Sequence, residues 1–594
     1  MQKIVIDTET YSNYFLLSCL NIESGNVRHF EFYDGQPLDI RTIKQIMSRC
    51  LTISFNGNGF DLPIIVAALK GYSVKQIKGL ADKIIKSNRP SWLICKDLGL
   101  NVPRNWDHID LIEVAPGQSS LKIYGGRLHA PKLQDLPIAP DASISPEQRQ
   151  LMRDYCVNDL DTTALLYSKL EKQVALRESM SKQYGVDLRS KSDAQIAETV
   201  IKSELQKMTG EYYGKTELDS NTKFRYRNPE IIAFETEQLK SIFDKVLTLD
   251  FTLGANGSVK MPQELADAKI KIGNSEYNMG IGGLHSCEKS QYIYADKEHV
   301  LLDVDVASYY PSIILQQQLA PKSLGQPFLE VYQSIVTRRL QAKREGDKVT
   351  ADTLKICVNG SFGKLGSKWS ALYAPDLLIQ TTITGQLALL MLIERLELEG
   401  ISVVSANTDG VVIYTDKDRL DDLRNIAFDW MLETSYELEE THYRCIASRD
   451  VNTYVAVTTD GEAKRKGAFA NGGLAKNPDC SIAFDAVAAF LANGTPVEQT
   501  INECDDITKF VLVRRVTGGA EWKGQYLGKA VRFYYSDDFE NSAQIDYAKN
   551  GNKVSKSDGC KPLMDLPESL PTDIDRPRYI DMAKKLLCEV GYAK

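Results

Sequence analysis

Short apolar runs bounded by polar turn residues recur along the chain and predict β-strands. The run Val300–Val306 is mostly apolar and rich in valine, which predicts a buried strand with Asp305 near its end. Two further runs, Ile401–Val404 and Val411–Tyr414, flank a polar segment that ends in Asp-Gly, and this pattern predicts a hairpin with Asp409 at its tip. Both carboxylates would then be presented from rigid strand ends, where an acid can hold a metal ion against a phosphate.

Helical periodicity follows between the predicted strand and the predicted hairpin. The segment Val336–Lys343 is separated from a second helical segment by Glu345–Asp347, where a glycine interrupts the pattern, so two antiparallel helices are predicted. Lys355, Asn359 and Phe362 fall at positions i, i+4 and i+7 of the second helix and therefore share one face. An ordinary solvated helix face is the alternative explanation for these polar residues.

The N-terminal residues combine a predicted strand with closely spaced acids. In the segment Lys3–Thr10, alternation places Asp7 and Glu9 on one face and two isoleucines on the other. Two carboxylates in this arrangement can jointly hold divalent metal ions for the hydrolysis of a phosphodiester. A second strand-to-turn segment, Ser54–Asp61, offers another acid at its end.

A further helix is predicted to begin near Ser145, because serine, proline and glutamine occupy its N-cap, N1 and N3 positions. On this helix Tyr155 and Asp159 lie one turn apart on one face. Each of these fragments alone is a weak signal, since an acid on a helix is usually only solvated. Their order along the chain is what gives them meaning.

The composition is that of a globular protein with several domains. The chain has 594 residues, 43% of them hydrophobic and 25% charged, and it contains no run of about 18 apolar residues, so no membrane span is expected. Eleven cysteines form no C-x-x-C pair, which argues against a zinc ribbon and against a disulfide scaffold. The predicted strand at Lys3 leaves no room for a signal peptide, and a cytoplasmic location is expected.

In chain order, three of these segments resemble motifs A, B and C of family B (α-like) DNA polymerases: D-x-x-S-L-Y-P-S, K-x-x-x-N-S-x-Y-G and D-T-D-S. The matching segments are Asp305–Ser312, Lys355–Gly363 and Asn407–Gly410. The resemblance implies a template-directed polymerase that extends a primer 3′-hydroxyl with dNTPs, with two Mg²⁺ ions (Mn²⁺ as a substitute) held by Asp305 and Asp409. It also implies dNTP contacts for Ser308, Tyr309, Tyr310, Arg339, Lys343, Lys355 and Asn359.

The match has departures. Asn407 stands where motif C usually has its first aspartate, and an amide oxygen is a weaker, uncharged ligand. Phe362 replaces the tyrosine of motif B, which keeps stacking and loses a hydroxyl, and Gly360 replaces a serine. Asp303 lies on the same strand face as Asp305, but the register of motif A selects Asp305. Because Asp409 is retained, an active site is expected.

The N-terminal segments resemble the three motifs of DnaQ-like 3′–5′ exonucleases: D-x-E, N-x-x-x-F-D and Y-x-x-x-D. The resemblance implies a proofreading site with two further Mg²⁺ ions, in which Tyr155 orients the attacking water. Its metal ligands would be Asp7, Glu9, Asp61 and Asp159, and the frayed primer end would contact Asn56 and Phe60.

DNA contacts are also implied outside the motifs. The segment Gly280–Gly283 resembles a template-contacting Y-x-G-G segment, although Gly280 replaces its tyrosine, and Asn452–Tyr454 resembles a primer-steadying K-x-Y segment without its lysine. The net charge of −8 directs attention to local basic tracks that would bind phosphates. The expected DNA-binding residues are Asn56, Phe60, Gly282, Gly283, Phe362, Gly363, Tyr454, Lys464 and Lys466. A second candidate track comprises Arg514, Arg515, Lys523, Lys529 and Arg532, and for any single lysine or arginine a solvated face is the alternative.

The resemblance implies an α/β multidomain fold, with an RNase H-like exonuclease domain followed by a right-hand polymerase. The expected parts are an exonuclease domain at 1–185, a linking region at 186–295, a palm at 296–325 and 372–470, fingers at 326–371, and a mainly helical thumb with a C-terminal tail at 471–594. Short intervals between the polymerase motifs leave no room for the insertions of protein-primed relatives, so no terminal-protein priming is expected.

The compactness is typical of a bacteriophage-type replicative polymerase in the host cytoplasm. Its expected partners are primer–template DNA, dNTPs, a helicase or primase and a single-strand binding protein, without a membrane. Two alternatives stay open: a non-catalytic DNA-binding scaffold for the exonuclease, with Asn407 as its first sign, and a repair or translesion enzyme. The retained acids argue against the first, and the complete proofreading set argues against the second.

Overall fold

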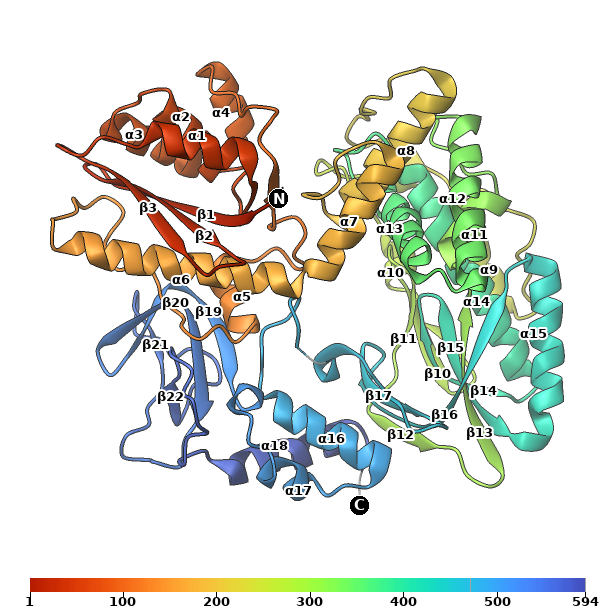
Figure 1. Cartoon of the computed structure of the whole chain (residues 1–594). Helices are drawn as coiled ribbons and strands as arrows, with labels where there is room; N and C mark the ends of the chain where they lie inside the picture. Colours follow the sequence, from red (N-terminus) through yellow and green to blue (C-terminus); the bar gives the residue numbers. More distant parts are fainter. Residues whose placement is uncertain (471, 593–594) are drawn as a thin grey trace.

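The computed structural model describes residues 1–470 and 472–592 and shows an α/β protein with several sheets. In Figure 1 the N-terminal sheet and its helices form the left side of the molecule, and the large central sheet forms the right side. The C-terminal region lies beneath the N-terminal sheet. The α/β class expected from the sequence is confirmed.

The N-terminal sheet has the strand order β3-β2-β1-β4-β5, with β1 antiparallel to β2 and parallel to β4. Alternation along β1 sends Ile4 and Ile6 into the core that contains α2 and α3, whereas Val5 packs on the side of α6. The strands are β1 (Lys3–Thr10), β2 (Phe15–Asn21), β3 (Val27–Phe32), β4 (Leu51–Ser54) and β5 (His108–Asp110). The helices are α1 (Ile40–Arg49), α2 (Asp61–Leu69), α3 (Val74–Lys86), α4 (Ser91–Asp97), α5 (Leu121–Arg127), α6 (Gln148–Lys169) and α7 (Glu171–Tyr184).

Helix α6 lies across the sheet face opposite to α1, α2 and α3 (Figure 1). It begins at Gln148, slightly later than the first turn predicted from Ser145. The side chain of Gln148 accepts a hydrogen bond from the backbone N–H of Ser145 at 2.9 Å, so the predicted reach back to the cap residue is present.

The central sheet has ten strands, in the order β18-β17-β16-β13-β15-β14-β11-β10-β9, with β12 paired to β16. Strand β13 lies between β15 and β16, and Asp305 is opposite Gly410 and Glu439. The predicted strand and hairpin are both confirmed. The strands are β9 (Ile270–Ile272), β10 (Ser275–Met279), β11 (Leu284–Ser286), β12 (Gln291–Tyr294), β13 (His299–Val306), β14 (Ser402–Asn407), β15 (Gly410–Asp416), β16 (Leu438–Asp450), β17 (Thr453–Thr458) and β18 (Ala463–Arg465).

Two antiparallel helices stand beside the sheet, α12 (Gln326–Glu345) and α13 (Lys348–Leu365), as the sequence predicts. Gly346 ends the first in the left-handed conformation at φ 73°, and the side chain of Asp347 caps the second by accepting from Thr350 N at 3.1 Å. Helix α8 (Asp193–Thr209) packs along both of them.

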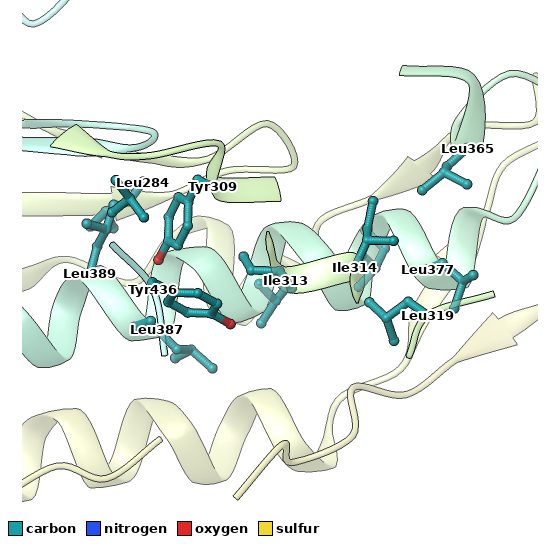
Figure 2. Packing of buried hydrophobic residues seen from close by; sticks show 14 of the residues in the cluster. Leu284, Tyr309, Ile313, Ile314, Leu319, Leu365, Leu377, Leu387, Leu389 and Tyr436 are labelled. Atoms are coloured by element: carbon teal, nitrogen blue, oxygen red, sulfur yellow. The ribbon is translucent and has the colours of Figure 1, made fainter. Parts of the chain in front are cut away.

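Helix α14 (Pro375–Leu398) lies behind the central sheet with α11 (Tyr309–Gln316) and α15 (Leu420–Thr434). It is long and apolar enough to cross a membrane, but 89% of its most apolar window is buried inside the protein, as in a core helix. Figure 2 shows Tyr309 and Tyr436 among the aliphatic residues of this core, with their rings edge to face at a centroid distance of 5.4 Å.

The smaller elements around α8 and the first strands of the central sheet complete this half of the molecule. Because β9 to β12 belong to the central sheet, the later part of the predicted linking region 186–295 is continuous with the predicted palm. These elements are β6 (Lys223–Phe224), α9 (Glu237–Thr248), β7 (Phe251–Leu253), β8 (Val259–Lys260) and α10 (Gln263–Ala266).

The expectation of a mainly helical C-terminal region is wrong. A four-stranded sheet of order β21-β19-β20-β22 is its centre, because two long runs of β-formers are joined by the tight turn Lys523–Gly524, with φ of 48° and 79°. The elements are α16 (Ser481–Asn493), α17 (Val497–Asn502), β19 (Leu512–Trp522), β20 (Gln525–Tyr535), β21 (Asp546–Tyr547), β22 (Cys560–Pro562) and α18 (Arg576–Glu589).

Candidate active sites

The N-terminal sheet and α6 bring three acids together. Asp7 and Glu9 project from β1 toward α6, and Asp159 projects from α6; one carboxylate oxygen from each lies within 4.8 Å of the others. Carboxylate oxygens are the ligands that Mg²⁺ and similar hard cations prefer. The donor set therefore fits divalent metal ions, and these three acids, which the sequence analysis selected, do lie in one place.

Asp61 lies at the N-terminus of α2, next to this group and not within it. Its carboxylate accepts hydrogen bonds from the backbone N–H and the hydroxyl of Thr8, at 3.1 and 2.6 Å. Burial raises the pKa of Asp61 to about 7, against the effect of these bonds. The acid is thus fixed beside Asp7, whose pKa it also raises by charge repulsion.

Burial and mutual repulsion disfavour four negative charges in this cluster. Burial, followed by the charges of Asp61, Asp159 and Glu9, raises the pKa of Asp7 well above its usual range. Burial and Asp159 raise the pKa of Glu9 to about 8. Such a cluster gains most from a bound cation, because a metal ion offsets the repulsion that protonation would otherwise relieve.

Lys122 is a member of this site that the sequence analysis missed. From α5 its ammonium group donates a hydrogen bond to Asp159 and lies 4.3 Å from the ring centroid of Tyr155. Burial raises the pKa of Asp159, while Lys122 and a hydrogen bond with Tyr155 lower it. No local pattern around Lys122 marks it, because α5 reaches α6 only through the tertiary fold.

The loop before α2 carries Asn56 and Phe60. This loop is held by Asp110, a second residue that the sequence analysis missed. The carboxylate of Asp110, at the end of β5, accepts from the backbone N–H of Asn56 at 2.8 Å and of Asn58 at 2.9 Å. Asn56 has a φ of 66°, a conformation that such anchoring stabilises. Asp110 therefore positions this loop close to the acid cluster.

The second site lies where β13 meets the tip of the β14–β15 hairpin. Asp305 and Asp409 line one cavity of about 600 Å³, and the backbone N–H of Val306 donates to the carbonyl of Asp409 at 2.7 Å. A β-carbon at position 410 would lie 2.0 Å from a carboxylate oxygen of Asp305. Gly410, where motif C has a serine, thus makes room for the acid.

Charge and partial burial set the electrostatics of this pair. Burial, then repulsion from Asp303 and Asp409, raises the pKa of Asp305 to about 7, while Lys464 and Lys466 oppose the shift. Burial likewise raises the pKa of Asp409. Two carboxylates flanked by cations fit divalent metal ions that are shared with an anionic ligand.

A neighbouring pocket of about 300 Å³ adjoins Asp409. Tyr310 lines it, and its ring stacks on Phe362 of α13 at a centroid distance of 4.3 Å. Arg339 of α12 donates a hydrogen bond to the hydroxyl of Ser308 at 2.8 Å. Asn359 also lines this pocket, so most of the predicted dNTP-binding residues lie together.

Three predicted dNTP-binding residues do not direct their side chains into this pocket as expected. The side chain of Tyr309 points into the core and donates to the carbonyl of Gly385 at 2.6 Å, so only its backbone can serve the pocket. Lys343 is exposed and pairs with Glu439 at 3.2 Å. Lys355 is exposed on α13 outside the lining of both cavities.

The glycine-rich segment before β11 reaches the same site. The hydroxyl of Tyr310 donates to the carbonyl of Gly282 at 2.7 Å. A β-carbon at Gly283 would lie 3.0 Å from the side chain of Thr408 in the hairpin turn, so this close approach favours glycine. Gly363, the last residue of motif B, is exposed on α13.

Three predicted DNA-binding residues line the larger cavity: Tyr454 on β17, Lys464 on β18 and Lys466 directly after β18. Asn407 lines it too, and its amide donates to the carbonyl of Val451 at 3.3 Å and to the side chain of Asn452 at 3.4 Å. Asn407 thus ties motif C to the turn that precedes Tyr454.

The second candidate track, which runs from Arg514 to Arg532, does not form one continuous DNA-binding surface. Arg532 is fully buried and donates to the carbonyls of Leu563 and Ala130, at 2.7 and 2.9 Å. Arg514 pairs with Asp479 at 2.8 Å. The prediction of phosphate contacts for Arg532 is therefore wrong, because sequence alone does not show that its strand position faces inward.

Comparisons with known proteins add little beyond these sites. No family model matches the chain, and no curated protein matches it. Among solved structures, the chain is similar to the family B DNA polymerase from the hyperthermophilic archaeon Pyrobaculum calidifontis, with a TM-score of 0.41 and 13% sequence identity over 100% of this chain and 78% of that chain.

Proposed function

We propose that the chain is a template-directed DNA polymerase that edits its product with a 3′–5′ exonuclease. The observation that carries this proposal is the pair of separate acid sites, one of which adjoins a pocket lined by stacked aromatic rings and by Arg339. Each site collects most residues of one motif set, although these residues come from distant parts of the sequence.

In the polymerase site Asp305 and Asp409 would hold Mg²⁺, which when bound supplies charge stabilisation for phosphoryl transfer. The chain itself contributes position. Arg339, near Ser308, and Lys343 on the next turn of α12 would grip the triphosphate. Tyr310, held by Phe362 and by its bond to Gly282, would close the space that a ribose 2′-hydroxyl needs.

In the exonuclease site Asp7, Glu9, Asp61 and Asp159 would hold the metal ions for hydrolysis of the primer end. Tyr155, which shares a hydrogen bond with Asp159, would orient the attacking water. Asn56 and Phe60, on the loop anchored by Asp110, would hold the frayed strand.

The biological setting is part of the same proposal. A compact chain of this type fits the replication of a bacteriophage genome in the host cytoplasm, from nucleic-acid primers and without a terminal protein. Primer–template DNA and dNTPs would be its substrates, and a helicase or primase and a single-strand binding protein would open duplex templates for it.

A labelled primer tests the proposal directly. A 5′-labelled primer–template with Mg²⁺ should lengthen in the presence of the four dNTPs and shorten without them. Shortening under both conditions would leave only the nuclease and favour a DNA-binding scaffold for the second site. Stable primer under both conditions would overturn the proposal.

A further inference from the structure

Asp303 is a third acid at the larger cavity. It lies two residues before Asp305 on the same face of β13, because side chains alternate along a strand. Asp303 is half-buried, and a half-buried carboxylate needs hydrogen-bond partners to replace lost water. The motif resemblance assigns no role to this position.

The carboxylate of Asp303 lines the same cavity as those of Asp305 and Asp409 and has a hydrogen-bond partner of its own. It accepts a hydrogen bond from the hydroxyl of Tyr443, a buried residue on β16. Among the residues that the structure describes, no group of three acids within metal-binding distance forms here, unlike the one at Asp7. The hydrogen bond places Asp303 to hold the side chain of Tyr443.

Tyr443 in turn contacts Lys464 in two ways. The ammonium group of Lys464 donates to the hydroxyl of Tyr443 at 3.3 Å and lies 5.1 Å from the centroid of its ring. The bond to Tyr443 uses one of three ammonium protons, so further donors can face the cavity. A flexible, exposed lysine is thereby fixed at one point of the cavity wall.

Strand β18 and the residue directly after it offer a comparison between two lysines. Lys464 and Lys466 lie two apart and both line the cavity, whereas Arg465 between them pairs with Asp485 at 2.6 Å. Lys466 continues the strand by a backbone bond to Tyr454. Only Lys464 has the contact with Tyr443, so the two lysines differ in anchoring rather than in charge or location.

We propose that Asp303 and Tyr443 are positioning residues that hold Lys464 against a backbone phosphate of bound DNA. The inference rests on the proposed function. In this proposal the hydrogen-bonded series Asp303, Tyr443 and Lys464 binds the DNA strand beside the catalytic acids. Asp305 and Asp409 hold the metal ions. A tyrosine hydroxyl that accepts from lysine and donates to a carboxylate is polarised in one direction, which strengthens both bonds.

Binding measurements without metal separate this role from catalysis. The dissociation constant of a fluorescent primer–template is measured by anisotropy in EDTA over a series of salt concentrations. Lys464→Ala should lower the slope of log K against log salt by about one. Asp303→Asn and Tyr443→Phe should each weaken binding by roughly two- to fivefold, because they release the lysine without removing it.

A double-mutant comparison gives the sharpest test. Asp303→Asn should add little to Lys464→Ala, but its effect should add fully to that of Lys466→Ala, the matched control. Thermal unfolding of each variant shows whether the fold is intact. Full additivity with both lysines, or wild-type binding by Asp303→Asn and Tyr443→Phe, would overturn the proposal.

Primer extension separates two kinds of failure. Asp303→Asn should raise the KM for primer–template and leave the Mg²⁺ concentration for half-maximal rate unchanged. If it instead abolishes extension and shifts the Mg²⁺ requirement as Asp305→Asn does, Asp303 is a metal ligand and the positioning role is wrong. If the wild-type chain extends no primer, the proposed function fails, while the anisotropy result still decides the binding role.

Discussion

The two acid sites solve the problem of concentrated negative charge differently. Around Asp7 three carboxylates meet within 4.8 Å, and Lys122 enters the cluster as a resident cation. Around Asp305 the pair formed with Asp409 shares its cavity with Asp303, and the cations stand on separate elements at the cavity wall. A self-contained cluster suits hydrolysis of one bound end, whereas the open pair leaves room for a substrate that brings its own phosphates.

The largest expected effect breaks the second site alone. Asp305→Ala should reduce primer extension by at least about 10³-fold, because one of two metal-holding carboxylates is lost. Degradation of single-stranded DNA should stay close to wild type, as measured on the same labelled primer. Retained extension would show that the wrong acid was chosen.

The reciprocal change breaks the first site. Asp7→Ala combined with Glu9→Ala should remove the shortening of the primer by a similar factor, since two of the three clustered acids disappear. Extension with dNTPs should persist. Loss of extension together with persistent degradation would reverse the assignment of the two sites.

The wall of the smaller pocket should control the choice of sugar. Tyr310→Ala removes the ring that stacks on Phe362 and should increase ribonucleotide incorporation by about 10- to 100-fold. Tyr310→Phe is the matched control, because it keeps the ring and loses only the bond to Gly282. Competition between labelled dNTPs and rNTPs measures the ratio, and an unchanged ratio in Tyr310→Ala would remove this residue from sugar selection.

The denser cluster should also have the stronger pH dependence. Folding raises the pKa of Asp7, and that of Glu9 to about 8, from ordinary values of about 4. Between these values the folded chain binds more protons than the unfolded chain, so stability falls as pH rises. In EDTA the thermal midpoint should be higher at pH 6 than at pH 8.

Two controls sharpen that prediction. Asp7→Asn with Glu9→Gln should flatten the dependence of the thermal midpoint on pH more than Asp305→Asn does. The reason is that Asp305 and Asp409 are less crowded than the N-terminal acids. Added Mg²⁺ should raise the midpoint more at pH 8 than at pH 6, where protons compete with the metal. A profile that is equally steep in all variants would contradict the comparison.

The smallest expected effect concerns the departure in motif C. Asn407→Asp removes the amide that donates to Val451 and Asn452, so extension should fall by roughly two- to fivefold rather than rise. Adding Asn452→Lys supplies a cationic partner and should restore part of the rate. A large gain from Asn407→Asp alone would instead identify Asn407 as a lost metal ligand.

What the sequence predicts correctly depends on local spacing. The hairpin that carries Asp409, the two helices around Gly346 and the face of β1 that holds Asp7 and Glu9 all follow from periodicity within a few residues. The site partners Lys122, Asp110 and Tyr443 do not, because each reaches its acid or loop only through tertiary packing.

The errors have the same physical origin. Arg532 was expected to bind phosphates because it is basic and near other cations, but its position on β20 faces the interior. The hairpin β19–β20 was missed although a tight turn at Gly524 joins two runs of β-formers, because the polymerase resemblance led to the expectation of helices there. A basic residue on a strand indicates a DNA-binding surface only when its side chain is known to face the solvent.

The hydrogen bonds of Arg532 bear on when the N-terminal part of the protein is completed during synthesis. Its guanidinium reaches the carbonyl of Ala130, and Arg127 reaches the carbonyl of Leu474 at 2.6 Å, so early and late residues of the chain hold one another. A ribosome releases the N-terminal domain long before these partners exist. That domain therefore acquires its final supports only when synthesis of the whole chain is nearly complete.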